Sequence, residues 1–272
     1  MEHIFETFVK LMHSSILEIN NLMLKKQADI VLKKKADGDL TRNIDKIVED
    51  NFIRKLKEIN LPVVLITEET GVINLSQSPL YALFLDPVDG SDMAARGYPL
   101  CSIAMSLYNL DKMEPELSLI GDIGSGKLFC SYKGKAFIYK NNNEKIIMKA
   151  APYRPLEKCM MVCYAAKPAR LMKIFEQRKI FEKVGLFLNY GGPMDIARIG
   201  EGTVDIFLEF QKGFKSIDFV AGIDIAEKAG AVVTDLQGNP FTIKIDLESR
   251  QKFLVTTNKE IHNQILDLLS EN

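Results

Sequence analysis

Two long stretches in the first sixty residues carry apolar side chains at helical spacing. Between residues 3 and 25 the apolar positions recur every three or four residues, as at Ile4, Phe8 and Leu11. That spacing places them on one face of a helix. Residues 39–59 repeat the pattern, so the sequence predicts a second amphipathic helix there.

Short apolar runs bounded by turn residues follow and predict strands. Tyr81–Leu85 is the most apolar of them and delivers Asp86 at its carboxyl end, where Pro87, which lacks an N–H, is expected to end the ladder. Five more runs have the same character: residues 62–67, 101–108, 116–123, 127–132 and 136–139. Together they predict a large, mostly antiparallel sheet.

From about residue 147 strands alternate with helical patterns. Strands are predicted at 160–164, 186–190, 204–210, 231–235 and 253–257, and helices at 168–181, 194–200, 216–229 and 258–269. The fold class is therefore α/β (α+β). We expect an N-terminal α+β subdomain over residues 1–146 and a C-terminal α/β subdomain over residues 147–272, packed as one body.

Composition narrows the function classes. The 272 residues are 47% hydrophobic and 26% charged with a net charge of −1, so no basic surface for nucleic acid is expected. No apolar run approaches 18 residues and no signal peptide is apparent, which predicts a cytoplasmic protein without a membrane partner. The four cysteines lie in apolar runs and are expected to be buried free thiols.

The segment after the strand at 81–85 carries the candidate chemistry. Asp86 and Asp89, with the Val88 carbonyl between them, are oxygen ligands that suit a hard divalent cation. Gly90 permits a sharp reversal, and Ser91 begins a short helical run whose first N–H groups can bind a phosphate. Taken alone, such a string is also good surface-turn chemistry.

Further acidic residues stand where strands end or helices begin. Glu69 follows the strand at 62–67, Asp45 and Asp218 lie in the first turns of helices, and Glu209 ends the strand at 204–210. Each has a local explanation: a solvated strand end, complementarity to the helix macrodipole, or capping, with Ser216 as the expected N-cap before Asp218. The charged residues 31–39 read as a mobile loop.

These segments, in this order, resemble the inositol monophosphatase family of Mg²⁺-dependent sugar phosphatases, and archaeal members most closely. The resemblance rests on Asp86-Pro87-Val88-Asp89-Gly90-Ser91, on Glu68-Glu69-Thr70, and on Asp218-x-x-Ala-Gly. Two departures are plain: Ile217 stands where the family usually has Trp, and residues 191–193 replace a Gly-Ser-Ala segment.

The resemblance implies a layered αβαβα sandwich in which a large, mostly antiparallel sheet and a smaller mixed sheet have helices between and outside them. It implies two or three Mg²⁺ ions, replaceable by Mn²⁺, held by Glu69, Asp86, Val88, Asp89, Asp218 and Asp45. Catalytic roles fall to Asp45, Ser91 and Glu69. Substrate contacts fall to Asp89, Gly90, Ser91, Gly192, Glu209 and Asp218. A lysine of the 31–39 segment would fold over the metal site.

The activity implied is hydrolysis of a sugar or polyol phosphate, either inositol monophosphate, fructose 1,6-bisphosphate or both, by a homodimer or homotetramer. Two alternatives stay open. One is a phosphatase for adenosine 3′,5′-bisphosphate from the same superfamily. The other is a non-catalytic, metal-binding regulatory protein.

Overall fold

The computed structural model describes residues 1–34, 40–140, 144–246 and 248–271. These residues divide into two compact units, Met1–Lys133 with Ile138–Ile146, and Gly134–Phe137 with Ile147–Asn272. How the two units pack stays a prediction, so each is described by itself. None of the described helices is long and apolar enough to cross a membrane.

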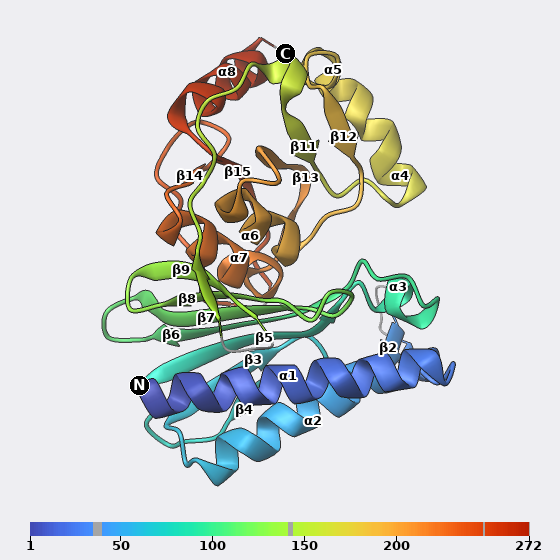
Figure 1. Ribbon diagram of the computed structural model, residues 1–272, viewed down its shortest axis with the longest axis vertical. Coiled ribbons are helices and arrows are strands. Elements are labelled where there is room, and N and C mark those ends of the chain that lie inside the picture. The colour runs from blue at the N-terminus through green and yellow to red at the C-terminus, as the bar shows by residue number, and fades with distance from the viewer. Residues whose placement is uncertain (35–39, 141–143, 247, 272) are drawn as a thin grey trace. The chain divides into compact units, whose positions relative to one another are not determined.

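In the first unit, helices cover one face of a large sheet (Figure 1). The described strands of this sheet follow the order β10-β9-β8-β7-β6-β5-β3-β4. Their bounds are β3 Val63–Thr67, β4 Gly71–Asn74, β5 Tyr81–Asp89, β6 Ser102–Asn109, β7 Glu114–Asp122, β8 Leu128–Tyr132, β9 Lys135–Tyr139 and β10 Lys145–Ile147. Among strands β3 to β8, neighbouring strands pair antiparallel except β3 and β5, which are parallel. The mostly antiparallel sheet is thus confirmed, with β4 and β10 as strands that the pattern did not predict.

Both predicted N-terminal helices form, but the second begins at Asn43 and not near residue 39, because Leu40–Arg42 pairs as a strand. Helix α1 (Glu2–Leu24) contacts β7 and β8, and α2 (Asn43–Glu58) contacts β3 and β5. Phe8 of α1 and Phe52 of α2 are fully buried with ring centroids 6.3 Å apart, so the two apolar faces share one core. Burying these faces supplies most of the stability of such helices, since propensity alone leaves them marginal.

Part of the expected loop at 31–39 is a strand. Val31–Lys34 forms β1, which pairs antiparallel with β2 (Leu40–Arg42). All four β1 side chains are exposed, so no apolar alternation marked it in the sequence. Residues 35–39 lie outside the described part of the chain, as does the predicted closure of this segment over the site.

The second unit is built on a mixed sheet. The order of its described strands is β12-β11-β13-β15-β14, with β11 parallel to β12 and β13, and β15 antiparallel to β13 and β14. The strands are β11 Met160–Val162, β12 Leu186–Leu188, β13 Ile206–Phe214, β14 Val232–Thr234 and β15 Gln251–Thr256. This agrees with the smaller mixed sheet that was expected.

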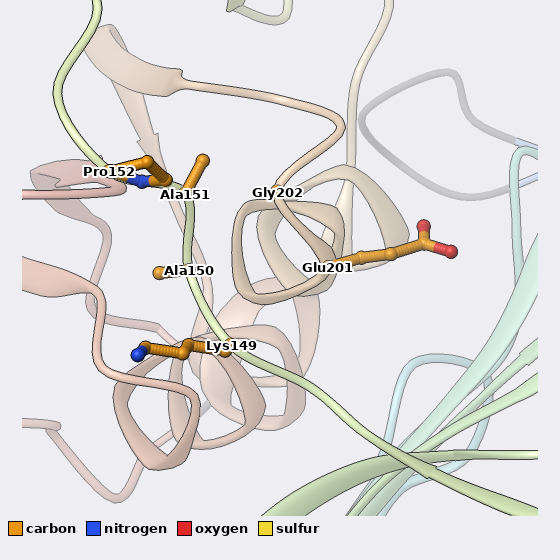
Figure 2. Close-up of a pocket in the computed structure, with 6 residues that line it drawn as sticks. All are labelled: Lys149, Ala150, Ala151, Pro152, Glu201 and Gly202. Carbon is orange, nitrogen blue, oxygen red and sulfur yellow. The ribbon is translucent and has the colours of Figure 1, made fainter.

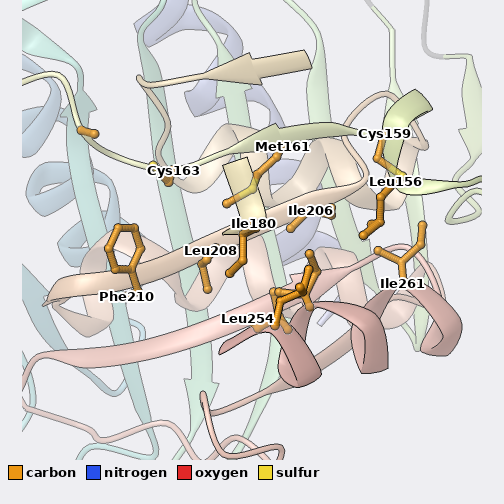
Figure 3. Close-up of a cluster of buried hydrophobic side chains, with 13 residues drawn as sticks. Leu156, Cys159, Met161, Cys163, Ile180, Ile206, Leu208, Phe210, Leu254 and Ile261 are labelled. Atoms are coloured by element: carbon orange, nitrogen blue, oxygen red, sulfur yellow. The ribbon is translucent and has the colours of Figure 1, made fainter. Parts of the chain in front are cut away.

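Successive residues of β13 pack into different cores, because the side chains of a strand point alternately to its two faces. Ile206 and Leu208 join a cluster with residues of α5 (Arg178–Phe181) and α8 (Lys259–Ser270), shown in Figure 3. Phe207 instead stacks on Phe253 of β15, with ring centroids 5.9 Å apart, on the side of Phe219 from α7 (Ser216–Lys228). The sheet is therefore buried on both faces.

The remaining helices of this unit show one correction. The predicted helix over 168–181 is broken into α4 (Pro168–Leu171), a 3-10 segment (Met172–Gln177) and α5. Helix α6 (Pro193–Glu201) packs closely on α7, and Gly222 permits this approach. A Cβ atom at Gly222 would lie only 2.6 Å from the Pro193 carbonyl oxygen. The Ala-Gly of the second signature is therefore a packing feature. All four cysteines are buried and free, as predicted.

Candidate active site

Glu69, Asp86 and Asp89 come from neighbouring strands at the same end of the large sheet. Strands β3 and β5 are parallel, and Thr67 pairs with Leu85. Glu69 thus lies two residues past the end of β3, beside the point where β5 continues into Asp86. The parallel register explains why segments far apart in sequence meet here.

A β-bulge sets the two aspartates on one face. Contrary to expectation, Pro87 does not end the strand, because β5 runs on to Asp89. Asp86 pairs with Ala104 and Asp89 with Ser102, so three steps along β5 match two along β6. In a regular strand, residues three apart face opposite sides of the sheet, and the extra residue of the bulge removes that difference. Pro87 is tolerated because a bulge does not need its missing N–H.

Glu49 of α2 accepts hydrogen bonds from the residues on both sides of Glu69 and so stabilises the turn that carries it. The Glu49 carboxylate is fully buried and accepts hydrogen bonds from the Thr67 hydroxyl at 2.9 Å and from the Thr70 N–H and hydroxyl at 3.0 and 2.6 Å. Lys46 lies 3.2 Å away and supplies a compensating charge. Sequence reasoning missed Glu49, although an acid on the apolar side of an amphipathic helix was a visible signal.

The junction of β2 and α2 connects three of the predicted site segments. The Thr41 hydroxyl donates to the Glu69 carboxylate. The Arg42 N–H donates to Asp45 Oδ2 at 2.7 Å, and its guanidinium contacts Asp92, next to Ser91, at 2.6 Å. Glu69, Asp45 and the Ser91 segment are therefore all tied to two consecutive residues.

The short helix after the signature loop forms as predicted. Helix α3 spans Ser91–Ala95, and Gly90 precedes it with φ at 79°, in the left-handed region that favours glycine. The Gly90 carbonyl accepts the Met93 and Ala94 N–H groups at 2.8 and 3.0 Å. The N–H groups of Ser91 and Asp92 precede these and have no carbonyl one turn earlier in the helix, so they are directed outward along its axis.

Asp218 lies in the second unit, in the first turn of α7. It accepts the Lys215 N–H at 2.9 Å, so Lys215 is the N-cap. The expected cap, Ser216, instead donates its hydroxyl to the Asp246 carbonyl at 2.8 Å. Ile217 is buried, so the residue that replaces the family tryptophan remains a core residue.

Gly192 is the N-cap of α6, and its N–H donates to Asp195 Oδ2 at 3.2 Å. Asp195 was missed in the sequence, yet it follows the same rule as Asp45 and Asp218. In each case an aspartate three residues into the helix accepts the N-cap N–H. This half of a capping box fixes a carboxylate at a helix N-terminus.

Glu209 does not end a strand, because β13 continues to Phe214. Its side chain is 1% exposed, and Oε1 accepts the N–H groups of Gln211 and Gly213 at 3.0 and 2.9 Å. Arg170 lies 3.7 Å from Oε2, and burial raises the pKa of the carboxyl. The surroundings of Glu209 are those of a residue that stabilises an irregular strand, which the pattern alone did not reveal.

Two features bear on the chemistry. Within the described residues, no three His, Cys, Asp or Glu side chains are already grouped as a metal site. Burial, reinforced by the charges of Asp89 and Asp122, raises the pKa of the Cys101 thiol to about 12. Cys101 therefore remains protonated at neutral pH and offers no thiolate nucleophile.

A separate hollow of about 410 Å³ lies in the second unit (Figure 2). Its lining comes from Lys149–Pro152 and from Glu201–Gly202 at the end of α6, and none of the predicted site residues belongs to it. The Lys149 and Glu201 side chains point away from each other. The hollow is thus distinct from the predicted site.

The chain is similar to known phosphatases over most of its length. The chain is 27% identical to a fructose-1,6-bisphosphatase/inositol-1-monophosphatase of Methanocaldococcus jannaschii, over 90% of this chain and 91% of that protein. It is 24% identical to a bifunctional NADP phosphatase/NAD kinase of Methanococcus maripaludis, over 88% of this chain but only 44% of that protein.

Solved structures extend the likeness to the fold. A crystal structure of an inositol monophosphatase–fructose 1,6-bisphosphatase matches with a TM-score of 0.80 and 26% identity, over 97% of this chain and 98% of that one. The SuhB protein of Bartonella henselae matches with a TM-score of 0.84 at 18% identity, over 99% of both chains. The sequence model of a family of generally Mg²⁺-dependent phosphatases matches residues 1–272. This chain therefore belongs to the inositol monophosphatase family.

Proposed function

We propose that this protein is a Mg²⁺-dependent phosphomonoesterase that hydrolyses inositol monophosphate, fructose 1,6-bisphosphate or both. The observation that carries the proposal is the bulge in β5, whose register puts Asp86 and Asp89 on one face next to the turn of Glu69. Membership of the family supports a phosphatase acting on a small phosphorylated substrate.

The donors at this end of the sheet fit magnesium. Glu69, Asp86, Asp89 and the Val88 carbonyl offer only oxygen, which Mg²⁺ and Mn²⁺ prefer. Asp86 is 2% exposed, and a buried carboxylate is best stabilised by a cation. We expect these groups to hold the metal, with Asp218 and Asp45 as further ligands. Bound Mg²⁺ would neutralise phosphate charge and lower the pKa of a water molecule.

The protein's own groups then have separate tasks. The N–H groups of Gly90 and Ser91 bind the substrate phosphate at the start of α3. The Ser91 hydroxyl and the Asp45 carboxylate orient the attacking water and take its proton. The Arg42 N–H holds Asp45 in place for this, at 2.7 Å from Oδ2.

Relatives suggest the substrates to compare. Archaeal relatives are named fructose-1,6-bisphosphatase/inositol-1-monophosphatase, and others combine an NADP phosphatase with an NAD kinase. The second candidate is therefore removal of the 2′-phosphate of NADP. It competes with the adenosine 3′,5′-bisphosphate activity considered from the sequence.

A substrate panel tests the proposal. Phosphate release would be measured with inositol 1-phosphate, fructose 1,6-bisphosphate, NADP, adenosine 3′,5′-bisphosphate and glycerol 2-phosphate, with and without Mg²⁺. We expect the first two to have the highest kcat/KM, with Asp89→Asn as the inactive control. A higher kcat/KM for either nucleotide would replace the proposed substrate. Absence of turnover on the whole panel, despite Mg²⁺ binding, would favour the regulatory alternative.

A further inference from the structure

Arg42 is a buried cation that contacts one aspartate from each of two separate segments. Its side chain is 8% exposed, with Nη1 on Asp29 and Nη2 on Asp92 at 2.6 Å. The two acids are themselves 69% and 72% exposed. Asp29 follows α1, whereas Asp92 is the second residue of α3. One guanidinium therefore joins two segments that lie 63 positions apart (92 − 29).

The chemistry of arginine suits this task. Its planar fork presents several N–H donors at fixed angles, so two carboxylates on different nitrogens are held at a fixed separation. A lysine ammonium, as a point charge on a flexible stem, cannot do the same. Exposed ion pairs usually contribute little, but here the cation is buried and depends on both partners.

The backbone of the same residue holds a third acid. The Arg42 N–H donates to Asp45 Oδ2 at 2.7 Å, while its side chain holds Asp92, the neighbour of Ser91. Asp45 and Ser91 are the two residues proposed to act on the attacking water. Arg42 thus contacts Asp45 itself and the residue next to Ser91.

We infer that Arg42 is a positioning residue that fixes the Ser91 helix relative to Asp45. This rests on the proposed function. The Asp92 contact serves catalysis, whereas the Asp29 contact serves only the anchoring of the chain after α1. The two contacts are chemically matched, so each is a control for the other.

The test compares Asp92→Asn with Asp29→Asn, each alone and combined with Arg42→Gln. Asp92→Asn should lower kcat about 10- to 100-fold with KM within about threefold of wild type, since small misplacement of reacting groups costs rate. Asp29→Asn should leave kcat within about threefold. Asp92→Glu, which retains the charge, should recover part of the loss. In the double-mutant cycles, Arg42 and Asp92 should couple in kcat, and Arg42 and Asp29 in thermal stability alone.

Amide hydrogen exchange gives a readout that does not depend on turnover. Peptides covering residues 88–97 should exchange faster in Arg42→Gln and Asp92→Asn, and at the wild-type rate in Asp29→Asn. Unchanged exchange in Asp92→Asn, or equal losses of kcat in the two aspartate variants, would overturn the inference. Absence of wild-type turnover on the substrate panel would overturn the proposed function instead, and the exchange result would still show whether Arg42 holds α3.

Discussion

Glu49 accepts both the backbone N–H and the side-chain hydroxyl of Thr70, at 3.0 and 2.6 Å. The two residues lie 21 positions apart, one on α2 and the other in the turn after β3. This carboxylate therefore decides where the turn that carries Glu69 sits relative to the helix that carries Asp45.

Replacing Glu49 should weaken both the fold and the metal site. In Glu49→Ala the fully buried Thr67 hydroxyl loses its acceptor, which costs about 1–3 kcal/mol for a buried group left unsatisfied. The exposed Thr70 loses two hydrogen bonds that water can replace. We expect at least that loss in urea denaturation, and a higher Mg²⁺ concentration for half-maximal activity. Asp50→Ala removes an exposed acid that contacts the same Lys46 at 2.8 Å and should cost less than about 1 kcal/mol. Similar losses in the two variants would contradict this role.

Metal removal should abolish activity reversibly. Chelation should stop phosphate release and added Mg²⁺ or Mn²⁺ should restore it. Asp89→Asn and Asp218→Asn should lower kcat severely while circular dichroism stays native, because each removes a proposed metal ligand and not a core residue. Without metal, thermal unfolding of these variants should occur at or above the wild-type temperature if the proposed ligands lie together, since each substitution then removes one repelling negative charge. Full turnover after exhaustive chelation would rule out the metal mechanism.

Ser91→Ala tests the assignment of the proton-transfer pair. We expect kcat to fall about 10²- to 10⁴-fold, the usual contribution of a positioned proton-transfer group, with KM nearly unchanged. Single-turnover kinetics would measure the chemical step directly. An unchanged rate would remove Ser91 from the mechanism, and a burst of phosphorylated protein would point to a side-chain nucleophile.

Glu209 should matter for stability and not for substrate choice. Glu209→Gln keeps the oxygen that accepts the Gln211 and Gly213 N–H groups and removes a buried charge, so stability should stay within about 1 kcal/mol. Glu209→Ala should lose more, by about 2–3 kcal/mol, in urea denaturation. Both variants should change kcat/KM equally for a polyol phosphate and an aryl phosphate. A loss confined to the polyol substrate would support the sugar contact that the sequence predicted for Glu209.

His262 should make the protein sensitive to mild acid. Its ring contacts the Thr234 and Thr256 hydroxyls at 2.8 and 2.9 Å, and burial lowers its pKa from 6.5 to about 4. Between pH 6.5 and about 4, His262 is therefore protonated in the unfolded chain and neutral in the folded chain. Stability from this group is complete above pH 6.5 and falls by up to about 1.4 kcal/mol per pH unit toward pH 4. Urea denaturation across this range should show a steeper decline in wild type than in His262→Gln, and parallel curves would contradict the assignment.

The sequence alone was enough for features that depend on neighbouring residues. Apolar periodicity located α1, α2 and the central strands, because the side-chain pattern of an element repeats within a few residues. Glu69, Asp86 and Asp89 were predicted as metal ligands from short motifs, which also span only a few neighbouring residues, and that assignment stays a prediction. The short helix that begins at Ser91 was predicted from Gly90 and the polar residues that follow it.

Tertiary structure decided what depends on distant partners. Pro87 stays within a strand because β6 accommodates a bulge opposite it, and β1 forms only because β2 pairs with it. Glu209 became a backbone support because β13 continues past it.

Glu49 and Arg42 are the clearest cases. Their partners lie 21 and 50 positions away in sequence, at Thr70 and Asp92. The sequence does not distinguish charged residues that face solvent from charged residues that contact each other. Only the tertiary structure buries the Glu49 carboxylate and the Arg42 side chain, and that burial makes the loss of their hydrogen-bond partners costly.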